Sequence, residues 1–175
     1  MTARPAVRSL ARVFTRPLSA VAAMVVMSAC QRGPASEPAS DSAAASALEP
    51  RDPQFLTPYG KPVNPFSPAV RAGNLLFLAG EIGTDSTGQL VKGGIEAETK
   101  QVMDNIQRTL AATGSSMERV VKCTVFMADM KEWPAMNVVY ATYFPNNKPA
   151  RSALGATALA RDARVEIECI AMAGR

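Results

Sequence analysis

Apolar and polar residues recur with two different periods in the second half of the chain. Between residues 95 and 113 apolar side chains return every three or four positions, which predicts a helix that Gly114 ends. The same period predicts a second helix from about Glu132 to Tyr143, with Pro134 tolerated in its first turn. Between the two helices, residues 121–127 alternate strictly, which predicts a strand with one buried face.

Short apolar runs predict the remaining strands. One run spans Asn74–Gly80, and two more span residues 150–158 and 164–172. The expected order is strand, strand, helix, strand, helix, strand, strand, which indicates an α+β domain at residues 51–175, with one mixed sheet and both helices on one face. The other face is then either polar and hydrated or packed against copies of the chain.

The first 29 residues have the pattern of a targeting segment. Four arginines precede a short apolar stretch that is too short to span a bilayer comfortably, since a span needs roughly 20 apolar residues. The sequence Met27-Ser28-Ala29-Cys30 resembles a bacterial lipobox, in which Cys30 would be lipidated, and Gln31 resembles the outer-membrane sorting pattern. We therefore expect a lipoprotein on the periplasmic face of the outer membrane. Methionine in place of leucine at Met27 leaves plain secretion to the periplasm open, and a cytosolic protein is the least favoured alternative.

Residues 30–50 are mainly Ala, Ser, Pro and Glu after the lipidated cysteine, and almost no bulky apolar side chain occurs among them. Such a stretch buries too little surface to offset the entropy of ordering, so we expect a disordered tether. Four of the 19 basic residues lie before Cys30 and none of the 15 acidic ones does, so the remainder has 15 of each. This balance indicates no nucleic-acid partner, and membrane attachment would come from the lipid on Cys30.

The chain has no histidine and only three cysteines. This excludes Ser-His-Asp and Cys-His catalysis and histidine-ligated zinc, and it leaves too few cysteines for a Cys-rich metal site, so no metal is expected. Cys123 and Cys169 lie on different predicted strands in what should be an oxidising compartment. Their inward-facing positions favour two buried thiols over a disulfide.

Arg151, Glu166 and Glu168 are the residues most suited to chemistry. A guanidinium holds a carboxylate with two parallel hydrogen bonds, so Arg151 suits a small anionic substrate. Glu166 and Glu168 are two residues apart on a strand and therefore share the face opposite Cys169. The alternative is an exposed sheet face on which Arg164 forms weak ion pairs with these glutamates.

Several motifs make residues 64–174 similar to the reactive intermediate deaminase (RidA/YjgF) family. The most diagnostic is Pro149-Ala150-Arg151-Ser152. The others are Asn64-Pro65-Phe66, Gly73-Asn74, Ala79-Gly80-Glu81-Ile82, Val120–Phe126 with Asp129-Met130, Met136–Tyr140 with Tyr143-Phe144, and Val165–Glu168.

The resemblance implies a chorismate-mutase-like trimeric fold with clefts between neighbouring subunits. It also implies hydrolysis of enamines and imines such as 2-aminoacrylate to 2-keto acids and ammonia, without a cofactor. Arg151 matches the arginine that holds the substrate carboxylate, and Glu166 matches the acid that orients or activates water. Asn137 and the backbone near Gly80 would line the same cleft.

Three departures make the expected site more apolar than is usual for the family. Phe66 replaces a tyrosine, Ala79 replaces a serine, and Ala153 stands where a cysteine is often found. Phe66 and Ala153 would still contact the substrate, and turnover would be slow or the preferred side chain larger and more apolar. Because the usual imines arise inside the cell, a non-catalytic periplasmic binding module for small carboxylates is the alternative function. A membrane-tethered scaffold with a vestigial cleft is a third.

Overall fold

The structure is a computed structural model, and it describes residues 52–174. The expected targeting segment at residues 1–29, the expected lipidation site Cys30 and the whole tether at 30–50 lie outside the described residues. Among residues 52–174 no helix combines the length and the apolar character needed to cross a bilayer.

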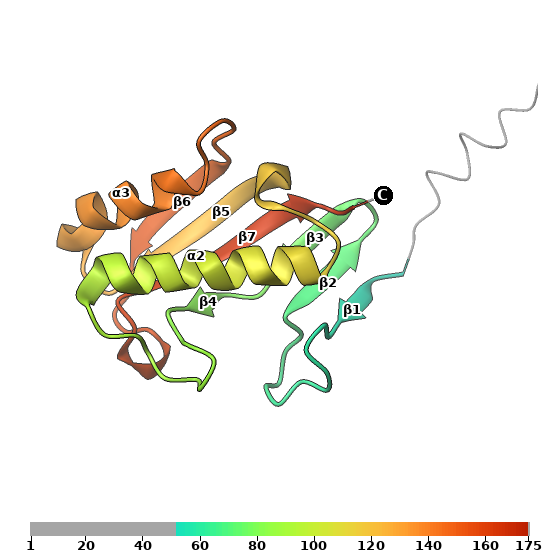
Figure 1. Cartoon of the computed structure of the whole chain (residues 1–175), viewed down its shortest axis with the longest axis horizontal. Coiled ribbons are helices and arrows are strands. Elements are labelled where there is room, and N and C mark those ends of the chain that lie inside the picture. The colour runs from blue at the N-terminus through green and yellow to red at the C-terminus, as the bar shows by residue number, and fades with distance from the viewer. Residues whose placement is uncertain (1–51, 175) are drawn as a thin grey trace, which may run out of the picture. The chain divides into compact units, whose positions relative to one another are not determined.

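Seven strands of the described region form one mixed sheet with the order β1-β2-β3-β7-β5-β6, and β4 pairs with β7 beside this path (Figure 1). All pairs are antiparallel except β5 with β6. Because β6 pairs only with β5, it is an edge strand. The strands are β1 (Gln54–Leu56), β2 (Ala69–Ala72), β3 (Leu75–Leu78), β4 (Glu81–Ile82), β5 (Val120–Met127), β6 (Ala150–Gly155) and β7 (Val165–Met172).

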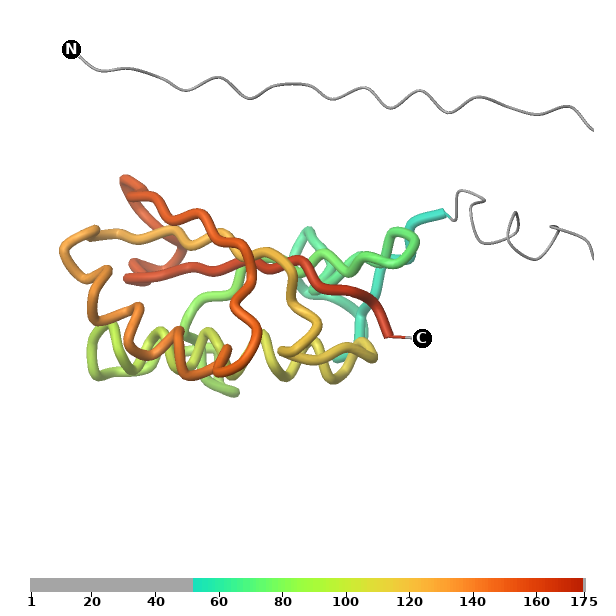
Figure 2. The backbone as a smooth tube through the Cα atoms, turned by 90° about the horizontal axis from the view of Figure 1, so that it is seen from above, coloured from blue at the N-terminus to red at the C-terminus, as the bar shows by residue number. Residues whose placement is uncertain are grey.

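Two helices, α2 (Gly94–Ala112) and α3 (Trp133–Thr142), cover the same face of this sheet (Figure 2). Three single turns of 3-10 helix, Met117–Arg119, Met130–Glu132 and Ala160–Asp162, connect the elements. Gly114 ends α2 with φ +77°, a left-handed conformation that suits glycine. The arrangement confirms the predicted fold class and both helices.

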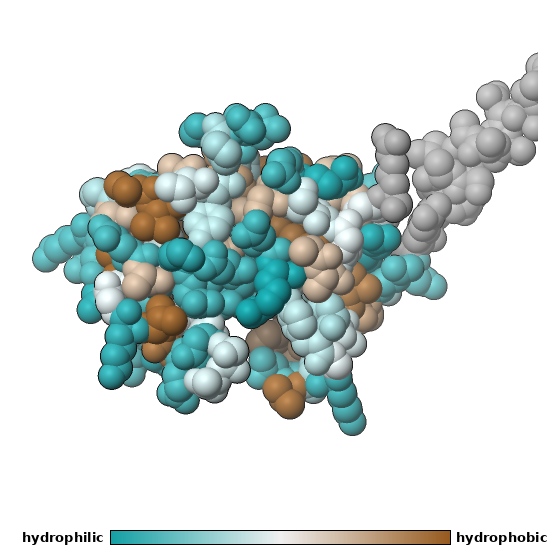
Figure 3. Space-filling view, in the orientation of Figure 1, coloured by the Kyte–Doolittle hydropathy of each residue, from teal (hydrophilic) through white to brown (hydrophobic). Residues whose placement is uncertain are grey.

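The core lies between the helices and the sheet. Its largest fully buried side chains include Met103, Ile106 and Leu110 of α2 and Val125 and Ile167 of the sheet. The outer side of α2 is hydrophilic, as Figure 3 shows, so this helix is amphipathic in the way its sequence period predicts.

Two polar residues inside this layer connect α2 to the loops. The Asn105 amide donates to the carbonyl oxygens of Ile82 at 3.2 Å and Thr84 at 3.0 Å. The buried Glu98 carboxylate accepts the backbone N–H of Arg164 at 2.8 Å. These bonds satisfy groups that would otherwise be buried without partners; those of Asn105 hold the end of β4 and the following loop against the helix, and that of Glu98 holds the residue before β7.

Some expectations for local structure are corrected. Four strands precede α2 in the described residues, whereas two were expected. Trp133, the first residue of α3, is 39% exposed.

The two cysteines of the sheet are bonded to each other, which corrects the expectation of two free thiols. Cys123 of β5 lies directly opposite Cys169 of β7, and their Cα atoms are 4.1 Å apart. Directly opposite residues of an antiparallel ladder are close enough for their side chains to meet, so this register brings the two sulfurs within bonding reach. Both residues are buried under the helices.

The face of the sheet opposite the helices carries many apolar side chains. Leu75, Phe77, Leu154 and Met172 are each between 36% and 43% exposed there. We call this side the open face; it also carries Phe126 and Ile170 and the polar residues Lys122, Thr124, Ser152, Glu166 and Glu168. Because the face carries both apolar and polar side chains, the two alternatives for it, a hydrated surface and packing against copies of the chain, both stay predictions.

Candidate active site

Arg151 lies on the edge strand β6, with its side chain on the helix side of the sheet. It is directly opposite Cys123, whose side chain is buried beneath the helices, and opposite residues share a face. The guanidinium carbon is 4.6 Å from the centre of the Tyr140 ring, a cation–π contact. Arg151 forms no ion pair with any residue of 52–174, so its hydrogen-bonding edge is available to an anion.

A cavity of about 330 Å³ lies between α3 and the start of β6. Its lining residues are Asn137, Tyr140, Ala141, Phe144, Lys148, Pro149 and Arg151. The walls are largely apolar and none of these residues is acidic, which is the composition of a pocket for a small anion with an apolar body. Of the expected site residues, Asn137 is the one that the chain brings together with Arg151.

Tyr140 is the central wall of this cavity. Its side chain is 7% exposed, its ring packs 5.0 Å from the Phe144 ring, and its hydroxyl has no hydrogen-bond partner among residues 52–174. Burial disfavours the phenolate and raises the pKa of Tyr140 to about 12, although Arg151 opposes the shift. The ring therefore stays neutral at physiological pH and supports the guanidinium through its π-face.

Glu166 lies on the open face, against Gly80. A Cβ atom built on Gly80 would stand 2.1 Å from the Glu166 Oε1 atom, so a larger residue at position 80 would force this carboxylate to move. Burial raises the pKa of Glu166, and the negative charge of Glu168 raises it further. A carboxyl group of raised pKa beside an exposed backbone is suited to exchange a proton with water.

Arg151 and Glu166 do not meet within one chain. The two strands are separated by β5, and Glu166 is three residues from Cys169, which lies level with Arg151. From ordinary strand spacings their Cα atoms are about 13 Å apart. An offset of three residues also places them on opposite faces, so one small substrate cannot contact both in a single protomer.

The other expected residues are distributed between these two positions. Ala153 shares the face of Arg151 and packs against the core, and Gly80 accompanies Glu166. Phe66 is 52% exposed in the loop between β1 and β2 and lines neither position. The alternative of ion pairs on the sheet face is wrong for Arg164, which instead pairs with Glu98 and Glu132.

Sequence reasoning did not assign the other five lining residues to the site, and Tyr140 and Lys148 are the two of them with polar side-chain groups. Tyr140 follows Asn137 by three positions on a helix, a spacing that is visible in the sequence, whereas Lys148 lies in the loop before β6 and has no comparable signal. Among residues 52–174 there is no group of three His, Cys, Asp or Glu side chains arranged to hold a metal ion.

The fold is a single mixed sheet with two helices on one face. Its edge strand carries an arginine that forms no ion pair among residues 52–174. Together these features place the protein in a class of small α+β proteins. Comparison with known proteins assigns the family. The model described as endoribonuclease L-PSP matches residues 58–173, and the chain belongs to this family, which is also called RidA/YjgF.

Named relatives and solved structures agree with this assignment. A RutC family protein of Pyrococcus horikoshii is 48% identical over 112 residues, which are 63% of this chain and 89% of the relative. The mouse 2-iminobutanoate/2-iminopropanoate deaminase is 43% identical over 113 residues, 64% of this chain and 84% of that protein. The structure of a Rid family protein from Yersinia pestis is 34% identical, with a TM-score of 0.65, and covers 69% of this chain and 99% of its own.

Proposed function

We propose that this protein hydrolyses 2-imino acids, and the enamines in equilibrium with them, to 2-keto acids and ammonia. The observation that carries the proposal is the Arg151 guanidinium, which is unpaired within residues 52–174 and borders a cavity with no acidic residue. Relatives named 2-iminobutanoate/2-iminopropanoate deaminase share more than 40% of their aligned residues with this chain, which supports this reaction over other uses of a carboxylate pocket.

The complete site would form between two copies of the chain, in the homotrimer that the family resemblance implies. Arg151 is on the edge strand β6, and Glu166 is on the open face with its apolar side chains. Packing the edge of one copy against the open face of the next would bury the apolar side chains of the open face. It would also bring the arginine of one copy toward Gly80 and Glu166 of the other.

In this arrangement Arg151 would hold the substrate carboxylate with two hydrogen bonds. Glu166 would accept a proton from a water molecule as the water oxygen attacks the imine carbon, which gives a carbinolamine. Starting from the protonated imine, the same carboxyl would return that proton to the carbinolamine nitrogen and then accept the carbinolamine hydroxyl proton as the C–N bond breaks, so that ammonia leaves and a 2-keto acid remains. General-base catalysis of this kind contributes typically ~10²–10⁴-fold, which is sufficient for an already unstable substrate.

The test is release of ammonia and keto acid from freshly generated 2-imino acids. Losing a charge-assisted contact costs about 1.5–3 kcal/mol, so we expect Arg151→Ala to lower kcat/KM roughly 10- to 100-fold. Arg151→Lys keeps the charge but loses the two-pronged geometry, so its activity should be intermediate. Equal rates for wild type and Arg151→Ala would refute the proposal.

A binding module for small carboxylates is the second candidate. It is favoured by Phe66, Ala79 and Ala153, which remove polar groups that the family usually carries. Calorimetric binding of keto acids without any turnover of imines would support this function instead.

For location, we propose an exported protein anchored through a lipid on Cys30. The Cys123–Cys169 disulfide supports export, because structural disulfides persist in oxidising compartments. Replacing Cys30 with alanine should move the protein from the membrane fraction to the soluble periplasmic fraction. An unchanged distribution would contradict lipid anchoring.

A further inference from the structure

The cavity beside α3 is bordered by two cationic side chains. Arg151 is half-buried against Tyr140, whereas Lys148 is exposed to solvent on the same cavity. Neither forms an ion pair with a described residue, and no carboxylate among the lining residues offsets their charge. The cavity therefore carries two positive charges, one more than a monocarboxylate substrate requires.

We propose that the second charge selects dicarboxylic substrates, so that the preferred compounds are 2-imino acids with an acidic side chain. This inference rests on the proposed deamination. Arg151 holds the carboxylate next to the imine, and Lys148 receives the side-chain carboxylate across the cavity. A volume of about 330 Å³ leaves room for a substrate of four or five carbons.

The size of the preference follows from the exposure of Lys148. Solvent-exposed ion pairs contribute about 0.2–1 kcal/mol, which corresponds to a roughly 1.5- to 5-fold preference for the dicarboxylate. Such an interaction is screened by salt, whereas the two-pronged contact of the half-buried Arg151 is screened less. A preference carried by Lys148 must therefore shrink at high ionic strength, while binding of monocarboxylates changes little.

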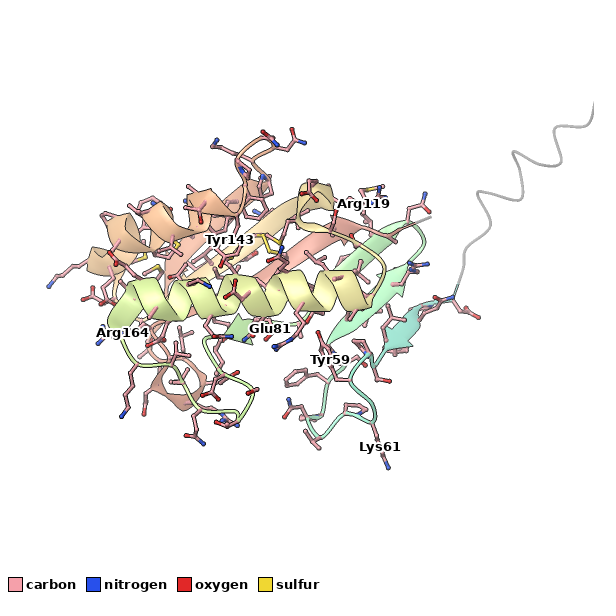
Figure 4. The ribbon with its side chains drawn as sticks, viewed as in Figure 1. Tyr59, Lys61, Glu81, Arg119, Tyr143 and Arg164 are labelled. Atoms are coloured by element: carbon pink, nitrogen blue, oxygen red, sulfur yellow. A yellow bond between two sulfur atoms is a disulfide. The ribbon has the colours of Figure 1, made fainter. Side chains whose placement is uncertain are left out.

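The experiment compares 2-oxoglutarate with 2-oxobutanoate, which are stable products of the two substrate classes. Calorimetry gives Kd for wild type, for Lys148→Gln and for Lys61→Gln, at low and at high KCl concentration. Lys61 is a suitable control because it is exposed on the loop between β1 and β2, away from α3 (Figure 4). The ratio of kcat/KM for the corresponding imines is measured in parallel, and gel filtration checks that the variants keep their oligomeric state.

We expect wild type and Lys61→Gln to bind 2-oxoglutarate more tightly, with the advantage lost at high salt. Lys148→Gln should bind the two keto acids with similar affinity, because its loss of affinity for 2-oxoglutarate exceeds any loss for 2-oxobutanoate. An unchanged ratio in Lys148→Gln, an equal loss for both keto acids, or a wild-type preference for 2-oxobutanoate would overturn the inference. Failure of the deaminase proposal is distinguishable, because it appears as no ammonia release while the binding ratio remains measurable.

Discussion

Removal of the Cys123–Cys169 disulfide should strongly destabilise the protein. The bond closes a loop with a sequence separation of 46 residues. In the chain-entropy model a loop of this length restricts the unfolded chain by about 4 kcal/mol at 25 °C. Small domains have a total free energy of unfolding of about 5–15 kcal/mol, so the disulfide supplies a large fraction of the stability.

The assay is urea unfolding of the wild type and of the double variant Cys123→Ala/Cys169→Ala, each with and without dithiothreitol. The variant should lose about 4 kcal/mol, and its melting temperature should fall by about 15 °C for a folded region of this size. Because the sulfurs are buried, part of the loss would come from the cavities that alanine leaves. Comparing reduced with oxidised wild type separates this packing loss from the effect of the bond.

Reductant should bring the wild type close to the double variant and leave the variant itself unchanged. If oxidised and reduced wild type differ by less than about 1 kcal/mol, the loop-entropy argument does not apply to this bond. Free thiols in the oxidised, folded protein, detected by a thiol reagent after unfolding, would refute the pairing itself.

Three further predictions concern single side chains. Tyr140→Leu removes the ring beneath Arg151 and should raise KM about 5-fold, the equivalent of roughly 1 kcal/mol, whereas Tyr140→Phe should keep the wild-type KM; equal effects in steady-state kinetics would contradict a π-contact. Burial raises the pKa of Glu166 and the charge of Glu168 raises it further, so Glu168→Gln should move the acidic limb of the pH–rate profile to lower pH. If the limb does not move, Glu166 is not the group that titrates in it. Burial raises the pKa of Glu81, outweighing Arg108 and the Thr109 hydrogen bond, so the folded state loses stability as pH rises above about 4.5. Glu81→Gln should therefore raise the melting temperature at neutral pH and not below pH 4.5, and calorimetry showing the same gain at both pH values would exclude titration as its cause.

The sequence predicts those elements whose periodicity is long enough to detect. The helix α2 has 19 residues and one apolar stripe, β7 has eight residues with strict alternation, and β5 has eight residues that alternate from Lys122 onward. By contrast β1 and β4 have three and two residues, too few for any period. They form because neighbouring strands supply hydrogen-bond partners, which is a long-range property of the fold.

The disulfide was mispredicted for a related reason. Alternation correctly places Cys123 and Cys169 on the inward face, but it does not specify which residues of two strands lie opposite each other. That register depends on the irregularity of β5 between Val120 and Lys122, beyond which Cys123 pairs with Cys169. Register is a tertiary property, and one step of slip would have moved every side chain to the other face.

The candidate site was predicted as a set of residue types but not as a geometry. The Pro149–Ser152 motif identifies Arg151, and the final strand identifies Glu166. The sheet then places the two on opposite faces, because β5 lies between their strands and their offset is an odd number of residues. Only the pairing of three strands contains this information.

The separation of Arg151 from Glu166 leads to a complementation test that distinguishes a site within one chain from a site between chains. Alone, Arg151→Ala should keep no more than about a tenth of the wild-type activity and Glu166→Gln no more than about a hundredth, since each lacks one half of every site. If the variants are unfolded together, mixed in equal amounts and refolded, each interface draws its arginine and its glutamate from different copies. With random assembly about a quarter of the interfaces then receive both native residues, and about a quarter of the wild-type activity should return. A site contained within one chain would recover no activity, because every chain in the mixture carries one of the two lesions.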